Sequence, residues 1–364
     1  MTTTFPAAVD SYSVKVDGVT EVLAAHVNDL QDAVVAIQNS LYQGNDNLLI
    51  NGGFDVWQRT TNHVDIKDAA RIYVADRWGF ITGVGELTNV QRSTTVRTGA
   101  RSKYSCEMVG AAGVGTVNIS QRIESLWSGR YKRTLYFSGY IYNGSGASFT
   151  PKIYVSTPSA ADTWTTSTVR NGGGSGEDLQ ACGDAAWTLV SWTADVSGYT
   201  DIGNGLEIRI ETPSGSLVAG DTVRLAEFCL ATLAETLYVQ PNIQQEIARC
   251  QRYYSKTFAI ATTPAQAVGA NTGEFVFIAH AAGASLQRSP SYLFPVRMRT
   301  APTITLYSPA SASAEARDLT GGADCTSTSA AVINENQILV NATGAAGTAI
   351  GNRIGIHIAA TAEL

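Results

Sequence analysis

NLLINGGFDVWQRTT, residues 47–61, is the stretch from which the architecture of the chain can be worked out. Three consecutive apolar residues are followed by two glycines, which favour a turn because Gly adopts positive φ without steric cost. We interpret the segment as a β-strand with its turn. In this interpretation Phe54 and Trp57 belong to a core, and Arg59 pairs with an acid or a carbonyl. The stretch therefore predicts the first strand of a β domain that begins near residue 47.

The composition favours a mainly β chain. Of 364 residues, 44% are hydrophobic and 34 are glycine. Only 15% are charged, against about 25% in typical globular domains. Short strand-like runs separated by Gly, Ser and Asn recur, and apolar and polar residues alternate in TLYFSGYIY (134–142) and LEIRIE (206–211). This pattern is typical of an antiparallel β-sandwich or jelly roll.

The charge balance argues against several function classes. The net charge is −6, and the longest basic cluster is RYKR at 130–133, whereas nucleic-acid binding needs a basic stripe. Apolar runs stay well below the ~20 residues that span a bilayer, and the N-terminal residues lack the pattern of a signal peptide. We therefore expect no nucleic acid, no membrane insertion and no signal peptide.

The five cysteines are scattered, odd in number and never spaced as CxxC. This arrangement argues against a disulfide framework and against a zinc site, and it indicates synthesis in a reducing cytoplasm.

The first 44 residues contain a helical repeat. Apolar residues in VTEVLAAHVNDLQDAVVAIQNSLYQG (19–44) are separated by 4, 3, 4, 3 and 4 positions, which is the a/d spacing of a coiled coil. One amphipathic helix packed on its own domain is the alternative, but three isolated heptads are too short to be stable in water. We therefore predict a homotrimeric coiled coil. Its seam consists of Leu23, Val27, Leu30, Val34, Ile37 and Leu41.

A second helical pattern, PNIQQEIARCQRYYSK (241–256), interrupts the β pattern and predicts a connector helix. The chain then divides into four parts. These are an N-terminal anchor with the coiled coil (1–46), a jelly-roll β-sandwich (47–234), the connector helix (235–255) and a smaller C-terminal β domain (256–364).

Four segments, taken together and in this order, resemble tailed-bacteriophage virion proteins of the tail-fibre or appendage type. They are HVNDLQDAVVAIQNSL, NLLINGGFDVWQR…YVADRW, EIARCQRYYSK and FPVRMRTAPTITLYSP. In that group NLLINGGFD is similar to the first strand of carbohydrate-binding-module-like jelly rolls, and VRLAEFCL (223–230) resembles their closing strand.

The resemblance implies a homotrimeric structural protein of the virion that docks on another virion protein through its N-terminal segment and contributes to attachment to host-surface glycans. A capsid decoration, head-fibre or neck protein is the alternative. A polysaccharide-degrading tailspike-type enzyme is a second alternative, but the sequence marks no pair of carboxylates and no GxSxG elbow. We therefore predict no catalytic residue.

The resemblance also implies a candidate calcium site. In the related jelly rolls an acid directly after NGxF and an acid on the last strand often coordinate Ca²⁺, and Asp55 and Glu227 occupy the matching positions. However, Ca²⁺ needs six to eight oxygen ligands, and LAEFCL lacks the paired acids that the family often has. We favour the simpler interpretation, in which Asp55 caps a turn or pairs with Arg59 or Arg77.

Aromatic residues provide the candidate glycan site. Four tryptophans in strand-like patterns are assigned to the core: Trp57, Trp78, Trp187 and Trp192. Trp164 lies in a polar, loop-like region and is expected to be exposed. The residues Tyr136, Tyr140 and Tyr142 form a stripe on one face of a strand. This stripe fits a sugar platform or a subunit interface, and for a trimer we favour the interface because Tyr is enriched there.

Overall fold

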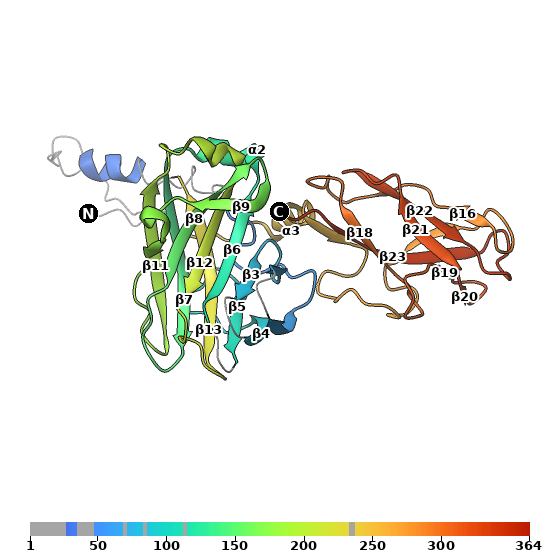
Figure 1. The fold of residues 1–364 in the computed structure, drawn as a ribbon, viewed down its shortest axis with the longest axis horizontal. Coiled ribbons are helices and arrows are strands. Elements are labelled where there is room, and N and C mark those ends of the chain that lie inside the picture. The colour runs from blue at the N-terminus through green and yellow to red at the C-terminus, as the bar shows by residue number, and fades with distance from the viewer. Residues whose placement is uncertain (1–26, 35–46, 68–70, 83–85, 112–114, 233–236) are drawn as a thin grey trace, which may run out of the picture.

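The computed structural model describes residues 27–34, 47–67, 71–82, 86–111, 115–232 and 237–364. It is mainly β, with several antiparallel sheets and few short helices, as the strand patterns predict. Two β units lie one after the other along the long axis of the molecule (Figure 1).

The first unit is a sandwich of two antiparallel sheets. One sheet consists, in spatial order, of β1 (Asn62–Lys67), β4 (Glu86–Ser93), β5 (Ser105–Gly110), β13 (Thr222–Ala231), β7 (Thr134–Gly144) and β11 (Ala186–Asp195). The other consists of β10 (Glu177–Asp178), β8 (Lys152–Ala160), β12 (Leu206–Thr212), β6 (Val117–Ile123), β3 (Gly79–Thr82) and β2 (Ile72–Tyr73), with β9 (Thr163–Val169) beside β8.

The sandwich core follows from the alternation in the sequence. On β7, Leu135, Phe137 and Ile141 are buried, while the tyrosines between them point to the opposite face and are half-buried. Phe228 of β13 lies at the centre, with its ring 5.3–5.6 Å from the rings of Phe54, Trp78 and Phe137. Burial of each such aromatic side chain contributes about 1.5–3 kcal/mol.

The prediction of a strand at the start of residues 47–61 is wrong, because this segment consists of turns and bends. Asn51 and Phe54 have positive φ values of 57° and 56°. Single backbone hydrogen bonds join the turn to β13, from Leu48 N to the Leu230 carbonyl and from Phe228 N to the Gly52 carbonyl. Gly52 is required because a Cβ there would lie 2.1 Å from the Phe228 carbonyl oxygen. The core roles predicted for Phe54 and Trp57 are confirmed, since both are buried.

The predicted second helix is observed as α3 (Ile243–Gln251), which begins after Asn242. The Asn242 side chain accepts a hydrogen bond from Gln244 N at 2.9 Å and so caps the helix. Glu246 and Cys250 form its buried face, whereas Ile243 is exposed.

The second β unit is organised around its last strand, β23 (Arg353–Thr361). Four strands pair with it: β14 (Tyr254–Lys256), β15 (Phe275–Ile278), β18 (Thr303–Tyr307) and β19 (Arg317–Asp318), the last of which also pairs with β20 (Ala323–Asp324). A smaller sheet has β22 (Gln337–Thr343) at its centre, paired with β16 (Leu286–Arg288), β17 (Tyr292–Leu293) and β21 (Ser327–Ala331). The remaining short helical segments are α2 (Ser125–Ser128), η1 (Gly129–Tyr131), η2 (Gly172–Gly174) and η3 (Thr200–Asn204).

Of the predicted coiled coil, residues 27–34 are described and are helical. Val27, Leu30 and Val34 are 47%, 59% and 45% exposed, so in one chain these seam positions face solvent. Leu23, Ile37 and Leu41 lie outside the described residues, and the described part of the chain contains no coiled coil. Among the helices that the structure describes, none combines the length and the apolar character that crossing a membrane requires.

Candidate functional site

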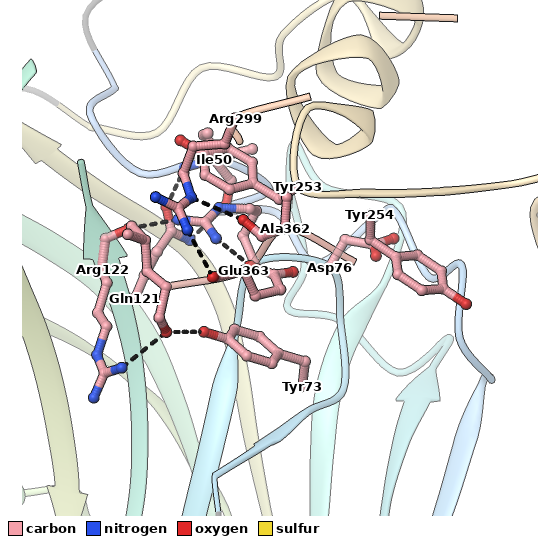
Figure 2. Close-up of polar contacts among 12 residues, drawn as sticks. Ile50, Tyr73, Asp76, Gln121, Arg122, Tyr253, Tyr254, Arg299, Ala362 and Glu363 are labelled. Carbon is pink, nitrogen blue, oxygen red and sulfur yellow. Dashed lines mark hydrogen bonds and ion pairs between the residues drawn. The ribbon is translucent and has the colours of Figure 1, made fainter. Parts of the chain in front are cut away.

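Residues of two motifs, NLLINGGFDVWQR…YVADRW and EIARCQRYYSK, meet where the two β units join. We call this contact the joint and define it by Arg59, Asp76, Arg77, Tyr253 and Glu363. Arg59 comes from the opening turn, Asp76 and Arg77 lie between β2 and β3, Tyr253 follows α3, and Glu363 follows β23. Figure 2 labels Asp76, Tyr253 and Glu363 of the joint and shows the polar contacts that gather around the last residues of the chain.

Glu363 is the centre of the joint. Its carboxylate accepts a hydrogen bond from Arg59 at 3.0 Å and another from Arg77. The Arg77 guanidinium is 1% exposed and lies on the Tyr253 ring, 3.4 Å from the ring centroid. A buried ion pair adds little net stability, but removal of one partner leaves an uncompensated buried charge. The joint is therefore stable only while it is complete.

The backbone around Glu363 is held from both units. Arg299 of the second unit donates to the carbonyls of Ala362 (2.8 Å) and Glu363 (3.1 Å). From the first unit, the Tyr73 hydroxyl (2.6 Å) and Arg122 (2.8 Å) donate to the Leu364 oxygen (Figure 2). Residues 362–364 thus bridge the two β units.

A second ion pair joins α3 to the sandwich. Arg252 donates twice to Glu124, at 2.9 Å each, and the Tyr253 hydroxyl donates to the same carboxylate. Burial alone would raise the pKa of Glu124, but the bonds from Arg252 and Tyr253 outweigh it and hold the pKa below its usual value. Such bidentate Arg–carboxylate pairs fix orientation as well as distance.

Asp76 is the fully buried carboxylate of the joint. Its carboxylate accepts from Gln58 N at 2.9 Å and from Arg59 at 3.1 Å. Burial raises the pKa of Asp76 to about 7, although Arg59 opposes this shift. Glu363 adds to the rise because it is a second carboxylate on the same arginine.

A cavity of about 360 Å³ lies next to the joint. Apolar side chains from the opening turn, from α2 and from the segment before α3 line it together with arginines, and they include Ile50, Trp127, Val239, Arg249 and Arg252. Arg249 and Arg252 are paired with Glu246 and Glu124, so their charges are already balanced. The lining of the cavity thus includes two arginines whose ion pairs hold α3 and the residue after it in place.

Asp55 and Glu227 hold one loop in place. Asp55 accepts from the backbone N–H groups of Lys103 (3.0 Å) and Tyr104 (3.2 Å). Glu227 accepts from the Arg97 guanidinium (2.8 Å), from Ser102 N (3.0 Å) and from Arg101 N. Burial raises the pKa of Asp55 to about 6, against the lowering effect of its two N–H donors.

These donors do not fit the predicted calcium ion. Ca²⁺ needs oxygen ligands, whereas nitrogen donors already occupy both oxygens of Glu227 and the Oδ1 of Asp55. Within the described ranges, His, Cys, Asp and Glu form no group of three or more that is placed to hold a metal. We therefore assign Asp55 and Glu227 to loop anchoring and derive no role for Ca²⁺.

The structure separates the predicted glycan residues. Trp164 is not in an exposed loop but in β9, half-buried, with the Arg122 guanidinium 4.6 Å from its ring centroid. Tyr136, Tyr140 and Tyr142 do share one face of β7. Tyr140 lies under Arg97 at 4.1 Å, and Tyr142 under Arg224 at 4.8 Å. Trp187 was assigned to the core, but it is half-buried on the same outer face, opposite Tyr142.

Sequence reasoning missed Glu363, Glu124 and Arg122. Arg122 lies near the end of β6, Glu124 follows β6, and Glu363 follows β23. Alternation along these strands identifies polar residues but does not identify their partners. The one available signal was the pair of ADRW and CQRYY motifs, whose arginine and tyrosine lie together in the joint.

Comparison with known proteins gives a likeness of fold. No protein-family model and no curated protein matches the chain. Among solved structures, the enzymatically active domain of tailspike protein 4 from bacteriophage CBA120 has a TM-score of 0.32 at 11% identity. That match covers 51% of this chain and 21% of the tailspike chain, so the chain spans about a fifth of the tailspike's length.

Two carbohydrate-binding modules also match. The CBM22-1 xylan-binding domain from Paenibacillus barcinonensis Xyn10C has a TM-score of 0.29 and 17% identity, over 54% of this chain and 96% of the module. TmCBM61, solved with β-1,4-galactotriose, has a TM-score of 0.28 and 12% identity, over 51% and 99%. The fold is thus distantly similar to β-sandwich carbohydrate-binding modules and to a phage tailspike domain, and at these identities the likeness is one of fold alone.

Proposed function

We propose that the chain is a non-enzymatic structural protein of a tailed-phage particle, a homotrimeric tail fibre or similar appendage that contributes to attachment to host-surface glycans. The joint is the observation that carries this proposal. The residues of the motifs that resemble phage appendage proteins serve to couple two β units through buried ion pairs. An elongated protein with a fixed joint suits a part that transmits a mechanical contact.

Exposed apolar side chains support the homotrimer. Three seam residues of the N-terminal helix face solvent in the single chain. The second unit also exposes large apolar side chains, namely Ile278, Leu286, Leu293, Val332 and Ile350. Apolar residues at a/d positions pair with copies of the same helix, and three linked subunits bind a repetitive surface with avidity.

The seam can be tested with a charge placed on it. We expect Leu30→Asp together with Ile37→Asp to lower the mass in solution from three copies to one and to prevent incorporation into particles, because aspartates at a/d positions oppose coiled-coil packing. Light scattering after size-exclusion chromatography measures the mass. Gln31→Asp adds a charge beside the seam and is the matched control.

Two outcomes contradict the proposed function. A wild-type protein that is monomeric at micromolar concentration would exclude the homotrimer. Release of reducing ends from host polysaccharide by the purified protein would show an enzyme.

A further inference from the structure

One row of side chains crosses five strands on the outer face of the first sheet. We call it the cross-strand row, and its members are Trp187 (β11), Tyr142 (β7), Arg224 (β13), Glu107 (β5) and Gln91 (β4). Each member is the direct register partner of the next, since Trp187 lies opposite Tyr142, Tyr142 opposite Arg224, Arg224 opposite Glu107, and Glu107 opposite Gln91. These five strands run side by side in the sheet (Figure 1).

The members of the row touch one another. The rings of Trp187 and Tyr142 have centroids 5.6 Å apart and are tilted by 56°. The Arg224 guanidinium lies 4.8 Å from the Tyr142 ring centroid and forms an ion pair with Glu107. Gln91 donates to the other oxygen of the Glu107 carboxylate. The row is therefore a continuous surface of two rings, a guanidinium, a carboxylate and an amide.

The row lies outside the core. Val190 and Trp192 of β11 are buried against the opposite sheet, and Trp187 lies on the other side of the same strand. Trp187 and Tyr142 remain half-buried, and Leu189, the next outward residue of β11, is 42% exposed. The aromatic end of the row is thus accessible, whereas its charged end is held in place by its own contacts.

We propose that the cross-strand row binds a neutral oligosaccharide, an inference that rests on the proposed role in glycan attachment. Aromatic rings stack on the apolar C–H faces of sugars, and a fixed guanidinium, carboxylate and amide bond their hydroxyls. Arg224 and Glu107 cancel each other's charge, which favours a neutral ligand over an acidic one.

The same features disfavour a trimer contact at this face. In the Arg224–Glu107 pair and the neighbouring Arg97–Glu227 pair it is mainly the arginines that remain exposed, at 16% and 22%, and a closely packed interface core would have to desolvate both guanidiniums completely. Interface cores are depleted of charged residues. Tyr142 is therefore assigned to the ligand and not to a subunit contact.

Calorimetric titration of the full-length protein tests the row with cellohexaose, maltohexaose and xylohexaose as neutral probes and oligogalacturonate as an acidic probe. We expect at least one neutral probe to bind and the acidic probe to bind at least tenfold more weakly. Trp187→Ala should weaken binding of that neutral probe about tenfold or more, because it removes the stacking surface. Glu107→Gln should weaken it as well, and Trp187→Phe, which keeps a ring, should weaken it less.

Tyr154→Ala is the matched control. Tyr154 lies on the outer face of the other sheet, where Arg209 stacks on it at 4.0 Å, so it offers the same chemistry outside the row. We expect this variant to bind the neutral probe like the wild type.

Three results would overturn the inference. They are no binding of any neutral probe, equal binding by Trp187→Ala and wild type, and loss of the trimer on Trp187→Ala. Failure of the row is distinguishable from failure of the proposed function, because the mass and the particle incorporation of the seam variants do not depend on a sugar.

Discussion

The two β units differ in what fills them. Aromatic and large aliphatic side chains fill the sandwich core, and among its 35 buried members in the described residues the one alanine is Ala75. The second unit has 14 such members, of which five are alanine (Ala279, Ala316, Ala342, Ala360 and Ala362). Because hydrophobic stabilisation scales with the apolar area removed from water, the second core contributes much less to the free energy of folding than the sandwich core does.

The smaller core of the second unit gives a reason for the many contacts that the joint makes. The second unit depends on one strand, β23, which pairs with four others, and the residues after β23 are those that the joint holds. Contacts that fix the end of β23 to the sandwich therefore stabilise the second unit, whose own core is small. The joint is then a condition for the stability of the second unit.

The largest expected effect comes from removal of the centre of the joint. Glu363→Ala leaves the Arg77 charge buried and unpaired, so we expect a loss of about 3–5 kcal/mol in the free energy of unfolding. Urea denaturation followed by limited proteolysis should show the second unit opening first.

The apolar double variant Arg77→Met with Glu363→Leu is its control. Replacement of both partners removes the unpaired charge, so the double variant should lose less stability than Glu363→Ala alone. If the two lose equal stability, the ion pair does not explain the coupling of the units.

The next effect is the pH dependence of stability that comes from Asp76. In the folded protein burial raises the pKa of Asp76 to about 7, whereas the ordinary value of an aspartate side chain is 3.8. Between these values the folded protein keeps a proton that the unfolded chain has lost, so the stability that Asp76 contributes is greatest below pH 4 and falls as the pH rises to about 7. The slope is at most about 1.4 kcal/mol per pH unit.

Asp76→Asn should remove this slope. Denaturation midpoints of wild type and variant at pH 5, 6, 7 and 8 measure it, and the difference between the two curves separates Asp76 from other groups. Asp55→Asn is the matched control outside the joint, since the pKa of Asp55 is also raised, to about 6. Parallel curves for wild type and Asp76→Asn would mean that Asp76 titrates normally.

The smallest effect compares the cores directly. Ile208 and Ile356 are both fully buried on strands, one in each unit. Ile→Val at each position should cost about 0.5–1.5 kcal/mol. In scanning calorimetry we expect Ile356→Val to lower the onset of unfolding and Ile208→Val to leave the onset unchanged. Equal shifts of one shared transition would show that the units unfold together.

Alternation along the strands was sufficient to predict the β class and the inward faces of β7 and β12, because a period of two identifies a half-buried strand. It failed for NLLINGGF, where positive φ at Asn51 and Phe54 and the close backbone approach at Gly52 make a turn from an apolar run. It also misplaced Trp187, since alternation gives the two faces of a strand but does not say which face holds the core.

The sequence by itself determined the class of fold, predicted a helix within 235–255 where the structure has one at 243–251, and singled out the ADRW and CQRYY segments, since these depend on local periodicity and residue type. The tertiary structure alone decided that these segments form a joint around Glu363 and that five strands align one polar and aromatic row. Partners such as Arg59 and Glu363 are separated by 304 positions, and the contacting pair Arg224 and Glu107 of the row by 117. No local pattern encodes contacts at such separations, because they arise only when sheets pair and pack.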